Sequence, residues 1–295
     1  MLVITDGNSL DFQPSFPGHL YFDSSNKDYS NSFVHSEKVT IADLQYHGTT
    51  TVAFKNGDNV IVCVDSKASI GKYVGSRTVK KVFPISPYIV ATMAGGAGDC
   101  AYWIRNIAAF VKSVEYEYEI PAIKVSSIAK VLANKLAEFK GAGLSVGTMI
   151  AGFDISSKQP SCTKLYVILS YEMIYPPKVY YVDSEGSYVS GDLFCVGSGA
   201  TLAYSVLDSA VAVPASESEK VSKDRNRASA LRCLSLDRAV EVAVEAVQVA
   251  AHRDGYSGGY INVLVINESG IRHLRRMQAK KFDQIESSYL QDKAS

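Results

Sequence analysis

The arrangement with the clearest chemical potential is one peptide bond, Gly48–Thr49, at the head of the run His-Gly-Thr-Thr-Thr-Val-Ala-Phe. If that bond is cut, Thr49 becomes an N-terminal residue that carries both a hydroxyl group and a free α-amine. The pKa of an α-amine is about 8, so at neutral pH part of it is uncharged and can take the hydroxyl proton. Thr49 would then supply both the nucleophile, its hydroxyl group, and the base, its α-amine. The simpler alternative is that three consecutive threonines only favour a β-strand.

The first predicted hairpin brings a carboxylate to this threonine. Two β-rich runs, 49–55 and 59–66, flank Asn56-Gly57-Asp58, and Asn-Gly is a strong hairpin signal. A turn centred on Gly57 pairs residues whose numbers sum to about 114, which sets Asp65 opposite Thr49. A register slip of one residue would turn these side chains to the other face of the sheet.

A second predicted hairpin supplies a lysine. The run 77–85 turns at Ser86-Pro87 and returns over residues 88–94. Lys81 is therefore expected to face the end of the returning strand, at Thr92–Met93.

A glycine-rich bend follows, Ala94-Gly95-Gly96-Ala97-Gly98-Asp99-Cys100, and leads into a predicted helix over 97–119. A strand, small residues and a helix start together present backbone N–H groups to an anion. The bend matches neither the Walker pattern nor the full dinucleotide fingerprint. It could serve as an oxyanion hole, in which the Gly95 N–H donates to the charge that develops on a peptide carbonyl. A phosphate cradle and a plain strand-to-helix connection remain the alternatives.

The remaining elements indicate an α+β fold, because hairpins dominate over strand–helix repeats. The economical architecture is a four-layer α-β-β-α sandwich, with two stacked antiparallel sheets and helices on both outer faces. A second helix is predicted from Pro121 until Gly141 and Gly143 stop it, and a long helix covers 236–252. Further strands are expected over 144–153, 178–182, 194–196, 260–267 and 270–275.

Composition argues against several classes of protein. With 295 residues, 47% apolar residues and a formal net charge of zero, the chain reads as a soluble globular protein. Balanced charge gives no argument for nucleic acid or a membrane surface as partner. No apolar run approaches the roughly 18 residues of a spanning helix, and the N-terminus lacks a signal-peptide pattern. The cysteines are scattered singly without metal-ligand spacing, which favours a reducing compartment and predicts no metal site: Cys63, Cys100, Cys162, Cys195 and Cys233.

The composition of residues 1–48 indicates an acidic leader segment. They contain six Asp or Glu residues against two Lys, a net charge of −4, and show no sustained helix or strand period. Because the whole chain is neutral, residues 49–295 carry about +4, so the leader would be an electrostatically matched, temporary partner of a single domain. An ordinary terminal tail is the alternative.

Seven segments of the chain share their order and spacing with one known family. They are Gly-Thr-Thr-Thr-Val-Ala-Phe at 48–54, Val-Asp-Ser-Lys-Ala-Ser at 64–69, Lys80-Lys81-Val82, Ala-Thr-Met-Ala-Gly-Gly-Ala-Gly-Asp-Cys at 91–100, Gly-Leu-Ser-Val-Gly-Thr-Met at 143–149, Phe-Cys-Val-Gly-Ser-Gly at 194–199 and His-Arg-Asp-Gly-Tyr-Ser-Gly-Gly at 252–259. These segments resemble the catalytic beta subunits of the eukaryotic proteasome core particle, and most closely the type-5, chymotryptic-type branch. The resemblance spans nearly all of residues 46–275.

The resemblance implies an N-terminal-nucleophile hydrolase that cleaves its own precursor between Gly48 and Thr49. Residues 1–48 would be a propeptide that is removed on maturation, and residues 49–295 the catalytic domain. Thr49 is implied as a threonine-protease nucleophile that hydrolyses peptide bonds after large hydrophobic residues.

Further roles follow from the same resemblance. Lys81 and Asp65 are implied as the charged pair beside Thr49, where a buried ammonium lowers the cost of an alkoxide and the carboxylate keeps it charged. Gly95 would give the oxyanion-hole N–H. Three residues match positions that hold the new N-terminus and its proton network: Ser198, Asp254 and Ser257.

The same segments imply a substrate pocket beside Thr49. Its side chains are small or apolar and none could pair with a charged substrate residue, so a large apolar residue is favoured. Flexible Met93 can mould to different apolar shapes. For each residue taken alone, plain core packing is the alternative. The residues implied to line the pocket and the substrate main chain are Ala68, Ser69, Val79, Met93, Ala97 and Cys100.

The family implies no cofactor, unfolded polypeptides as substrates, a location in cytoplasm and nucleus, and stacked seven-membered rings with other alpha and beta subunits.

The sequence departs from the family at Lys67, where arginine is common; lysine keeps the charge but loses the planar fork of the guanidinium group. Segments near 155–177 and 211–235 separate motifs that family members connect more directly. Surface insertions, subunit contacts and mis-translated intervening sequence are the three explanations.

Two other functions are alternatives to the peptidase. A structural ring subunit with a vestigial site conflicts with the joint presence of the implied site residues. A nucleotide-binding protein would use the two glycine-rich turns, at 94–100 and 197–199, but leaves the Gly48–Thr49 junction unexplained.

Overall fold

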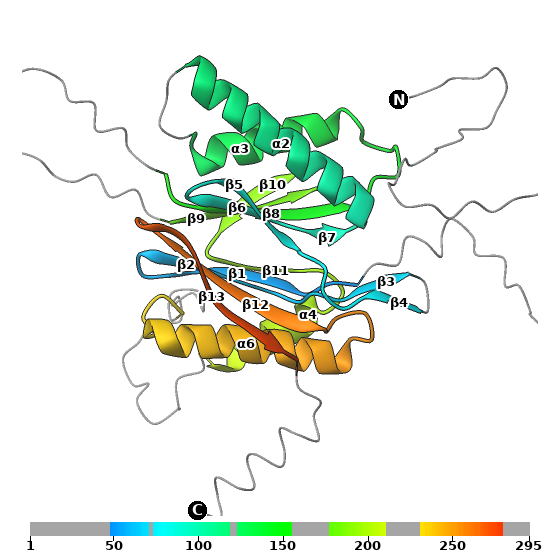
Figure 1. Cartoon of the computed structure of the whole chain (residues 1–295), viewed down its shortest axis with the longest axis vertical. Helices are drawn as coiled ribbons and strands as arrows, with labels where there is room; N and C mark the ends of the chain where they lie inside the picture. Colours follow the sequence, from blue (N-terminus) through cyan, green and yellow to red (C-terminus); the bar gives the residue numbers. More distant parts are fainter. Residues whose placement is uncertain (1–47, 71–72, 119–122, 155–176, 211–230, 280–295) are drawn as a thin grey trace, which may run out of the picture. The chain divides into compact units, whose positions relative to one another are not determined.

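The computed structural model describes residues 48–70, 73–118, 123–154, 177–210 and 231–279 (Figure 1). Within these ranges the strands form two large antiparallel sheets and one separate two-stranded hairpin. The predicted mixture of helices and antiparallel sheets is confirmed.

One large sheet holds the strand that follows Thr49. Its strand order is β11-β1-β2-β12-β13, so β13 lies at one edge. Every neighbouring pair in it is antiparallel. The strands are β1 (Thr51–Asn56), β2 (Asn59–Val64), β11 (Leu193–Val196), β12 (Tyr260–Asn267) and β13 (Gly270–Gln278).

The other large sheet has the order β10-β9-β8-β6-β5, and short β7 pairs with β8. Its strands are β5 (Val82–Ser86), β6 (Ile89–Thr92), β7 (Ala94–Gly95), β8 (Val146–Gly152), β9 (Lys178–Asp183) and β10 (Tyr188–Gly191). The separate hairpin consists of β3 (Ala68–Ile70) and β4 (Tyr73–Ser76), which the sequence analysis did not predict.

Four helices accompany the sheets in the described ranges. Figure 1 shows α2 and α3 beside the sheet that contains β5 and β8, and α6 beside the sheet that contains β12 and β13. The helices are α2 (Ala97–Glu117), α3 (Val125–Ala137), α4 (Ala200–Ala210) and α6 (Leu236–Arg253). Helix α4 begins directly after the glycine-rich turn at 197–199. The first two residues of the second predicted helix, 121 and 122, lie outside the described residues.

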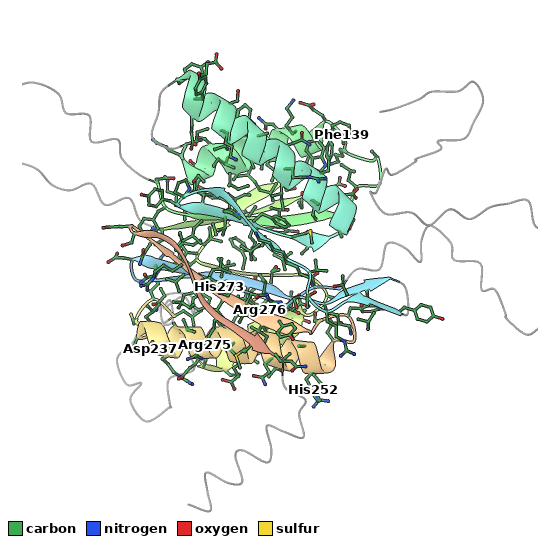
Figure 2. The ribbon with its side chains drawn as sticks, viewed as in Figure 1. Phe139, Asp237, His252, His273, Arg275 and Arg276 are labelled. Atoms are coloured by element: carbon green, nitrogen blue, oxygen red, sulfur yellow. The ribbon has the colours of Figure 1, made fainter. Side chains whose placement is uncertain are left out.

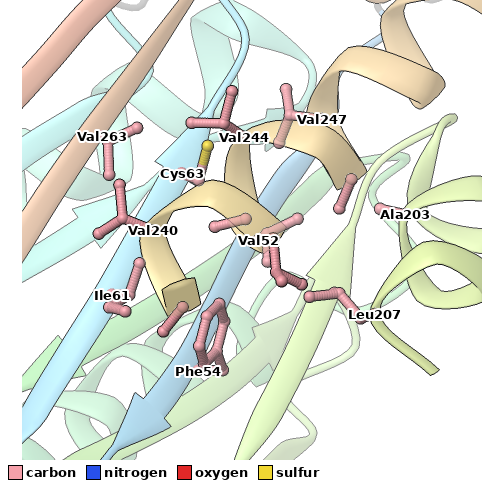
Figure 3. Packing of buried hydrophobic residues seen from close by; sticks show 14 of the residues in the cluster. Val52, Phe54, Ile61, Cys63, Ala203, Leu207, Val240, Val244, Val247 and Val263 are labelled. Carbon is pink, nitrogen blue, oxygen red and sulfur yellow. The ribbon is translucent and has the colours of Figure 1, made fainter. Parts of the chain in front are cut away.

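Alternation along β1 explains how one strand serves two apolar clusters. Val52 and Phe54 pack with residues of α4 and α6, such as Leu207 and Val244 (Figure 3). Ala53, between them, joins a cluster that contains residues of both large sheets. A third cluster joins α2 and α3 to the sheet of β6 and β8. Side chains of a strand point alternately to its two faces, so the two-residue period of the sequence sets these contacts.

The first hairpin forms as predicted but one residue out of the expected register. Thr51 pairs with Val64, so partner numbers sum to 115 and Asp65 stands opposite Thr50 instead of Thr49. Asp65 N–H donates to the Thr50 carbonyl at 3.1 Å. The centre of the turn lies half a residue beyond Gly57, because the Asn-Gly signal locates a turn but does not fix its exact centre.

The second hairpin is shorter than predicted. The sequence suggested a strand from Arg77, but β5 begins at Val82. The preceding segment bonds elsewhere: Val79 N–H donates to the Ser66 carbonyl at 2.9 Å. The expected position of Lys81 is confirmed, since its carbonyl accepts a hydrogen bond from Met93 N–H at 2.9 Å.

The first predicted insertion joins the described fold after β8 and before β9, and the second lies between α4 and α6. Residues 155–176 and 211–230 themselves lie outside the described residues. Gly152 pairs with Lys178 at the base of the first. At the base of the second, Asn56 Nδ2 donates to the Leu231 carbonyl at 2.8 Å, at the far end of β1. With about 3.3 Å of rise per strand residue, that end is well over 10 Å from Thr49.

Candidate active site

Thr49 is held just before β1 by a close backbone contact. Its side chain is largely buried, with 4% of the residue surface exposed. A Cβ atom built on Gly197 would lie 2.0 Å from the Thr49 carbonyl oxygen, and Gly197 has a φ of +109°. Only glycine fits this position, which explains the glycine that follows β11 in the sequence.

A buried charge pair lies against the Thr49 hydroxyl. Lys81 Nζ lies 2.9 Å from Thr49 Oγ1 and 2.7 Å from Asp65 Oδ1. The Lys81 and Asp65 side chains expose only 2% and 0% of their surface. The structure thus brings together the nucleophile, carboxylate and lysine that the sequence predicted.

Backbone groups fix the Asp65 carboxylate. Its Oδ1 also accepts from Thr50 N–H at 3.1 Å, and its Oδ2 accepts from Gly258 N–H at 2.9 Å and Lys67 N–H at 3.2 Å. Charge-assisted bonds of this kind orient a carboxylate and compensate part of its burial. Asp65 is therefore fixed by the residue before β1, by the segment between β2 and β3 and by the loop after α6.

Burial lowers the pKa of Lys81 below its ordinary value, Lys67 lowers it further by like-charge repulsion, and Asp65 and Asp254 oppose the shift. Desolvation disfavours the charged form of a buried lysine. Its neutral form is therefore easier to reach than that of an exposed lysine, and a neutral amine can accept the proton of the neighbouring hydroxyl.

A second network surrounds the Thr49 nitrogen. Thr49 N–H donates to Ser198 Oγ at 3.2 Å, and the Ser198 hydroxyl donates to Asp254 Oδ2. The Ser257 hydroxyl donates to the same oxygen at 2.6 Å. Since that proton is committed, the Thr50 hydroxyl is the donor in its 2.7 Å contact with Ser257. The network would hold an amine at this nitrogen in a fixed place.

The Gly48 carbonyl lies inside the same cluster of groups. Its oxygen accepts from Thr49 Oγ1 at 2.8 Å and from Lys81 Nζ at 3.3 Å. A Cβ atom built on Gly48 would lie 1.7 Å from the Cβ of Tyr256, so a side chain cannot be placed there without displacement. The glycine of the Gly48–Thr49 bond is thus required by space.

Gly95 lines a cavity of about 280 Å³ that also reaches Gly197, the glycine in contact with Thr49. Gly95 has a φ of +104°, and a Cβ atom built there would lie 2.6 Å from the Ser145 carbonyl oxygen. The predicted glycine-rich bend is therefore a sterically demanding connection beside the site.

The predicted pocket residues divide into two groups. Val79, Met93, Ala97 and Cys100 belong to the apolar cluster of α2 and α3. Within it, Cys100 is fully buried and its Sγ donates to the Ala94 carbonyl, and burial raises its pKa to about 11. Ala68 and Ser69 instead stand in β3, where they pair with β4.

Sequence reasoning missed several residues that hold the site. Thr50 is one, although its signal was present: strand alternation puts it on the face of Val52, and a hydroxyl buried there needs a partner. Lys67 was noted only as a departure, yet its Nζ donates to the Gly255 carbonyl. Ser66, which accepts from Tyr260 N–H at 2.7 Å, gave no signal.

Comparisons with known proteins agree with this geometry. A family model described as proteasome subunit matches residues 45–168 and 156–235. Proteasome subunit beta type-5 of Gallus gallus is 39% identical over 228 residues, which cover 77% of this chain and 74% of that protein. The chain belongs to the proteasome subunit family.

Other members of the proteasome subunit family match over a similar length. Proteasome subunit beta type-5 of Dictyostelium discoideum is 39% identical over 224 residues, 76% of this chain and 68% of that protein. Proteasome subunit beta type-8 of Homo sapiens is 37% identical over 224 residues, 76% of this chain and 67% of that protein. The family resemblance seen in the sequence is confirmed.

The described residues of this family member contain neither a metal-binding cluster nor a membrane-spanning helix. No group of three or more His, Cys, Asp or Glu side chains there could hold a metal ion. No helix in the same ranges has the length and apolar character needed to cross a membrane.

Proposed function

We propose that the chain is a threonine endopeptidase subunit of the proteasome core particle that cleaves after large hydrophobic residues. The observation that carries the proposal is the 2.9 Å contact between Lys81 Nζ and Thr49 Oγ1, made by a lysine that is itself paired with buried Asp65. A nucleophile beside a base that a third group orients is the arrangement needed for covalent catalysis of acyl transfer.

In the precursor, the first reaction is cleavage of the Gly48–Thr49 bond. Lys81 accepts the Thr49 hydroxyl proton, and Oγ1 attacks the carbonyl carbon of Gly48. The C–N bond breaks, the nitrogen takes a proton, and an ester joins residues 1–48 to the Thr49 oxygen. Water then hydrolyses this ester. Contact of both Oγ1 and Lys81 Nζ with the Gly48 carbonyl oxygen supports this order of events. Residues 1–48 are thus the propeptide, and residues 49–295 the mature chain.

In the mature chain, the new α-amine of Thr49 joins Lys81 as a proton acceptor. Oγ1 attacks the substrate carbonyl, the leaving amine takes a proton, and water releases the acyl group from Thr49. The Gly95 N–H stabilises the oxyanion. The network described above keeps the α-amine in place: Ser198, Asp254 and Ser257.

The preference for large hydrophobic substrate residues follows from the uncharged side chains of the proposed pocket. Met93 and Val79 are apolar, and Met93 N–H is bonded to the carbonyl of Lys81, which ties the pocket to the reacting groups. Ala68 and Ala97 leave room for a large side chain, and Ser69 lines its main chain. Cys100 supports the pocket from the core.

The family membership supports wider proposals. The two sheets and their helices form a four-layer α-β-β-α sandwich, for which the three apolar clusters argue. The subunit assembles with other alpha and beta subunits in stacked seven-membered rings that degrade unfolded polypeptides in the cytoplasm and nucleus. Segments near 155–177 and 211–235 are insertions.

The test is the intact mass and N-terminal sequence of the chain recovered from assembled particles. Wild type should begin at Thr49, and a Thr49→Ala variant should keep residues 1–48. Thr51→Ala is the matched control, because its hydroxyl bonds to the Val196 carbonyl at 3.1 Å instead of joining the site, and it should be processed normally. A wild-type chain that keeps its leader in the particle would favour the structural-subunit alternative, since Thr49 would have no free amine.

A further inference from the structure

A second cavity lies beside Lys81 of the candidate active site, which forms part of its lining. Its volume is about 310 Å³, and its walls come from the start of β5, from β2 and from the edge strand β13. It therefore opens between the edges of the two large sheets. Its floor is apolar, formed by Val64, Val82 and Leu264. We refer to it as the edge cleft.

The rim of the edge cleft carries two cationic side chains, Lys80 and Arg276, and the imidazole of His273. In the described part of the chain, no aspartate or glutamate lines it. Among the described residues, none of these three side chains forms an ion pair with a carboxylate. The Arg276 guanidinium lies over the Tyr260 ring, 4.8 Å from its centroid, which holds the charge in place.

A β-bulge brings two of these side chains to the same side of β13. His273 and Arg276 are three residues apart, a spacing that puts side chains on opposite faces of a regular strand. The register shifts between Val263 and Leu264, so that His273 stands opposite Leu264 and Arg276 opposite Asn262, two residues of β12 that both line the cleft. The bulge thus directs the His273 and Arg276 side chains into the edge cleft.

Arg275 is a neighbouring arginine with which Arg276 can be compared. It stands opposite Val263, which packs in the cluster of α6, so it belongs to the other face of β13. His273, Arg275 and Arg276 are all exposed, and Figure 2 labels all three along this strand. Two arginines of equal charge and neighbouring number therefore differ in whether they face the edge cleft.

We propose that the edge cleft receives an acidic side chain, or a chain-terminal carboxylate with its apolar stem, from the neighbouring subunit of the ring. The inference rests on the proposed ring assembly. An apolar floor with a cationic rim matches a carboxylate on a hydrocarbon stem. Among the described residues, β5 and β13 are the end strands of their sheets, which leaves room beside them for an extended segment. Lys81 and Val79 line the same cleft, so its occupant abuts the segment that carries the proposed base.

The first experiment compares Arg276→Glu with Arg275→Glu, which is the matched control. Each variant is expressed in cells beside a differently tagged wild-type chain, and incorporation into core particles is measured by mass spectrometry. Arg276→Glu should lower incorporation about fivefold or more, because it places a like charge against the partner's carboxylate, while Arg275→Glu stays within about twofold. Equal incorporation of the two variants would overturn the proposal.

The second experiment keeps the proposal testable if Arg276→Glu fails to fold. A photo-crosslinking amino acid at position 273, in particles that contain the full chain, should capture a neighbour's peptide that contains Asp, Glu or a C-terminus. Replacing that acidic residue with lysine should restore incorporation of Arg276→Glu. A crosslink confined to this chain, or to a segment of the neighbour that contains no Asp, no Glu and not the chain's own C-terminus, would overturn the inference while ring assembly stands. Absence of the wild-type chain from all particles would instead overturn ring assembly.

Discussion

Replacing Lys81 with methionine tests the buried charge pair of the candidate site. Methionine keeps an apolar stem but removes the ammonium, whose Nζ lies 2.7 Å from Asp65 Oδ1 and 2.9 Å from Thr49 Oγ1. Because Asp65 has no exposed surface, the variant leaves a carboxylate in the interior without this counter-charge.

The expected cost follows from the remaining partners of Asp65. Removing one member of a buried pair costs about 3–5 kcal/mol. Asp65 keeps N–H donors from Thr50, Lys67 and Gly258, so we expect the lower end, about 3 kcal/mol in the free energy of unfolding. At about 1.4 kcal/mol per factor of ten, the unfolded fraction rises roughly a hundredfold.

The assay combines urea denaturation of the purified precursor with mass spectrometry of Gly48–Thr49 cleavage. Lys81→Met should abolish cleavage as well as lower stability. Adding Asp65→Asn should recover about 1–2 kcal/mol, because the stranded charge is gone, while cleavage stays absent. Lys80→Met is the matched control, since Lys80 is exposed; it should cleave normally and change stability by less than about 0.5 kcal/mol.

Two results would refute this reasoning. If Lys81→Met still cleaves at about half the wild-type rate or faster, Lys81 is not the base for Thr49. If it costs less than about 1 kcal/mol, the pair is not buried as described.

Two further predictions concern the surroundings of this pair. Lys67 lowers the pKa of Lys81, so Lys67→Met should raise that pKa and move the midpoint of the cleavage rate against pH upward, whereas Lys67→Arg should not; an unchanged midpoint in a pH series would contradict this. Gly48→Ala places a Cβ 1.7 Å from Tyr256 Cβ and should slow cleavage about tenfold or more, because the reacting bond must move. Gly98→Ala, where a Cβ meets nothing within 4 Å, should leave the time course unchanged, and equal rates for both alanine variants would count against the steric argument.

Local signals predicted much of the fold. The Asn-Gly turn located the first hairpin, and apolar periodicity located α6, which runs from Leu236 to Arg253 against the predicted 236–252. The centre of the turn was predicted less accurately, since the Asn-Gly signal is compatible with more than one loop length, and loop length helps to set the register. The slip that puts Asp65 opposite Thr50 shows this limit.

The candidate site was partly predictable because its members occur in recognisable segments. The first hairpin brought Asp65 near Thr49, whereas the place of Lys81 beside them was implied by the family resemblance. Ser66 and Lys67 were not predicted as supports, because their partners, Tyr260 and Gly255, are about 190 residues away. Hydrogen bonds over such separations leave no local pattern.

By itself, the sequence determined the candidate cleavage site, most of the elements around it and the family, since each depends on residue type and short-range spacing. Only the tertiary structure decided how the charges are arranged. It buries Lys81, which lowers its pKa, sets the Gly48 carbonyl against the same amine, and uses a bulge in β13 to turn His273 and Arg276 to one side. These properties come from packing between distant segments, where burial and register, rather than residue type, set the energy of a charge.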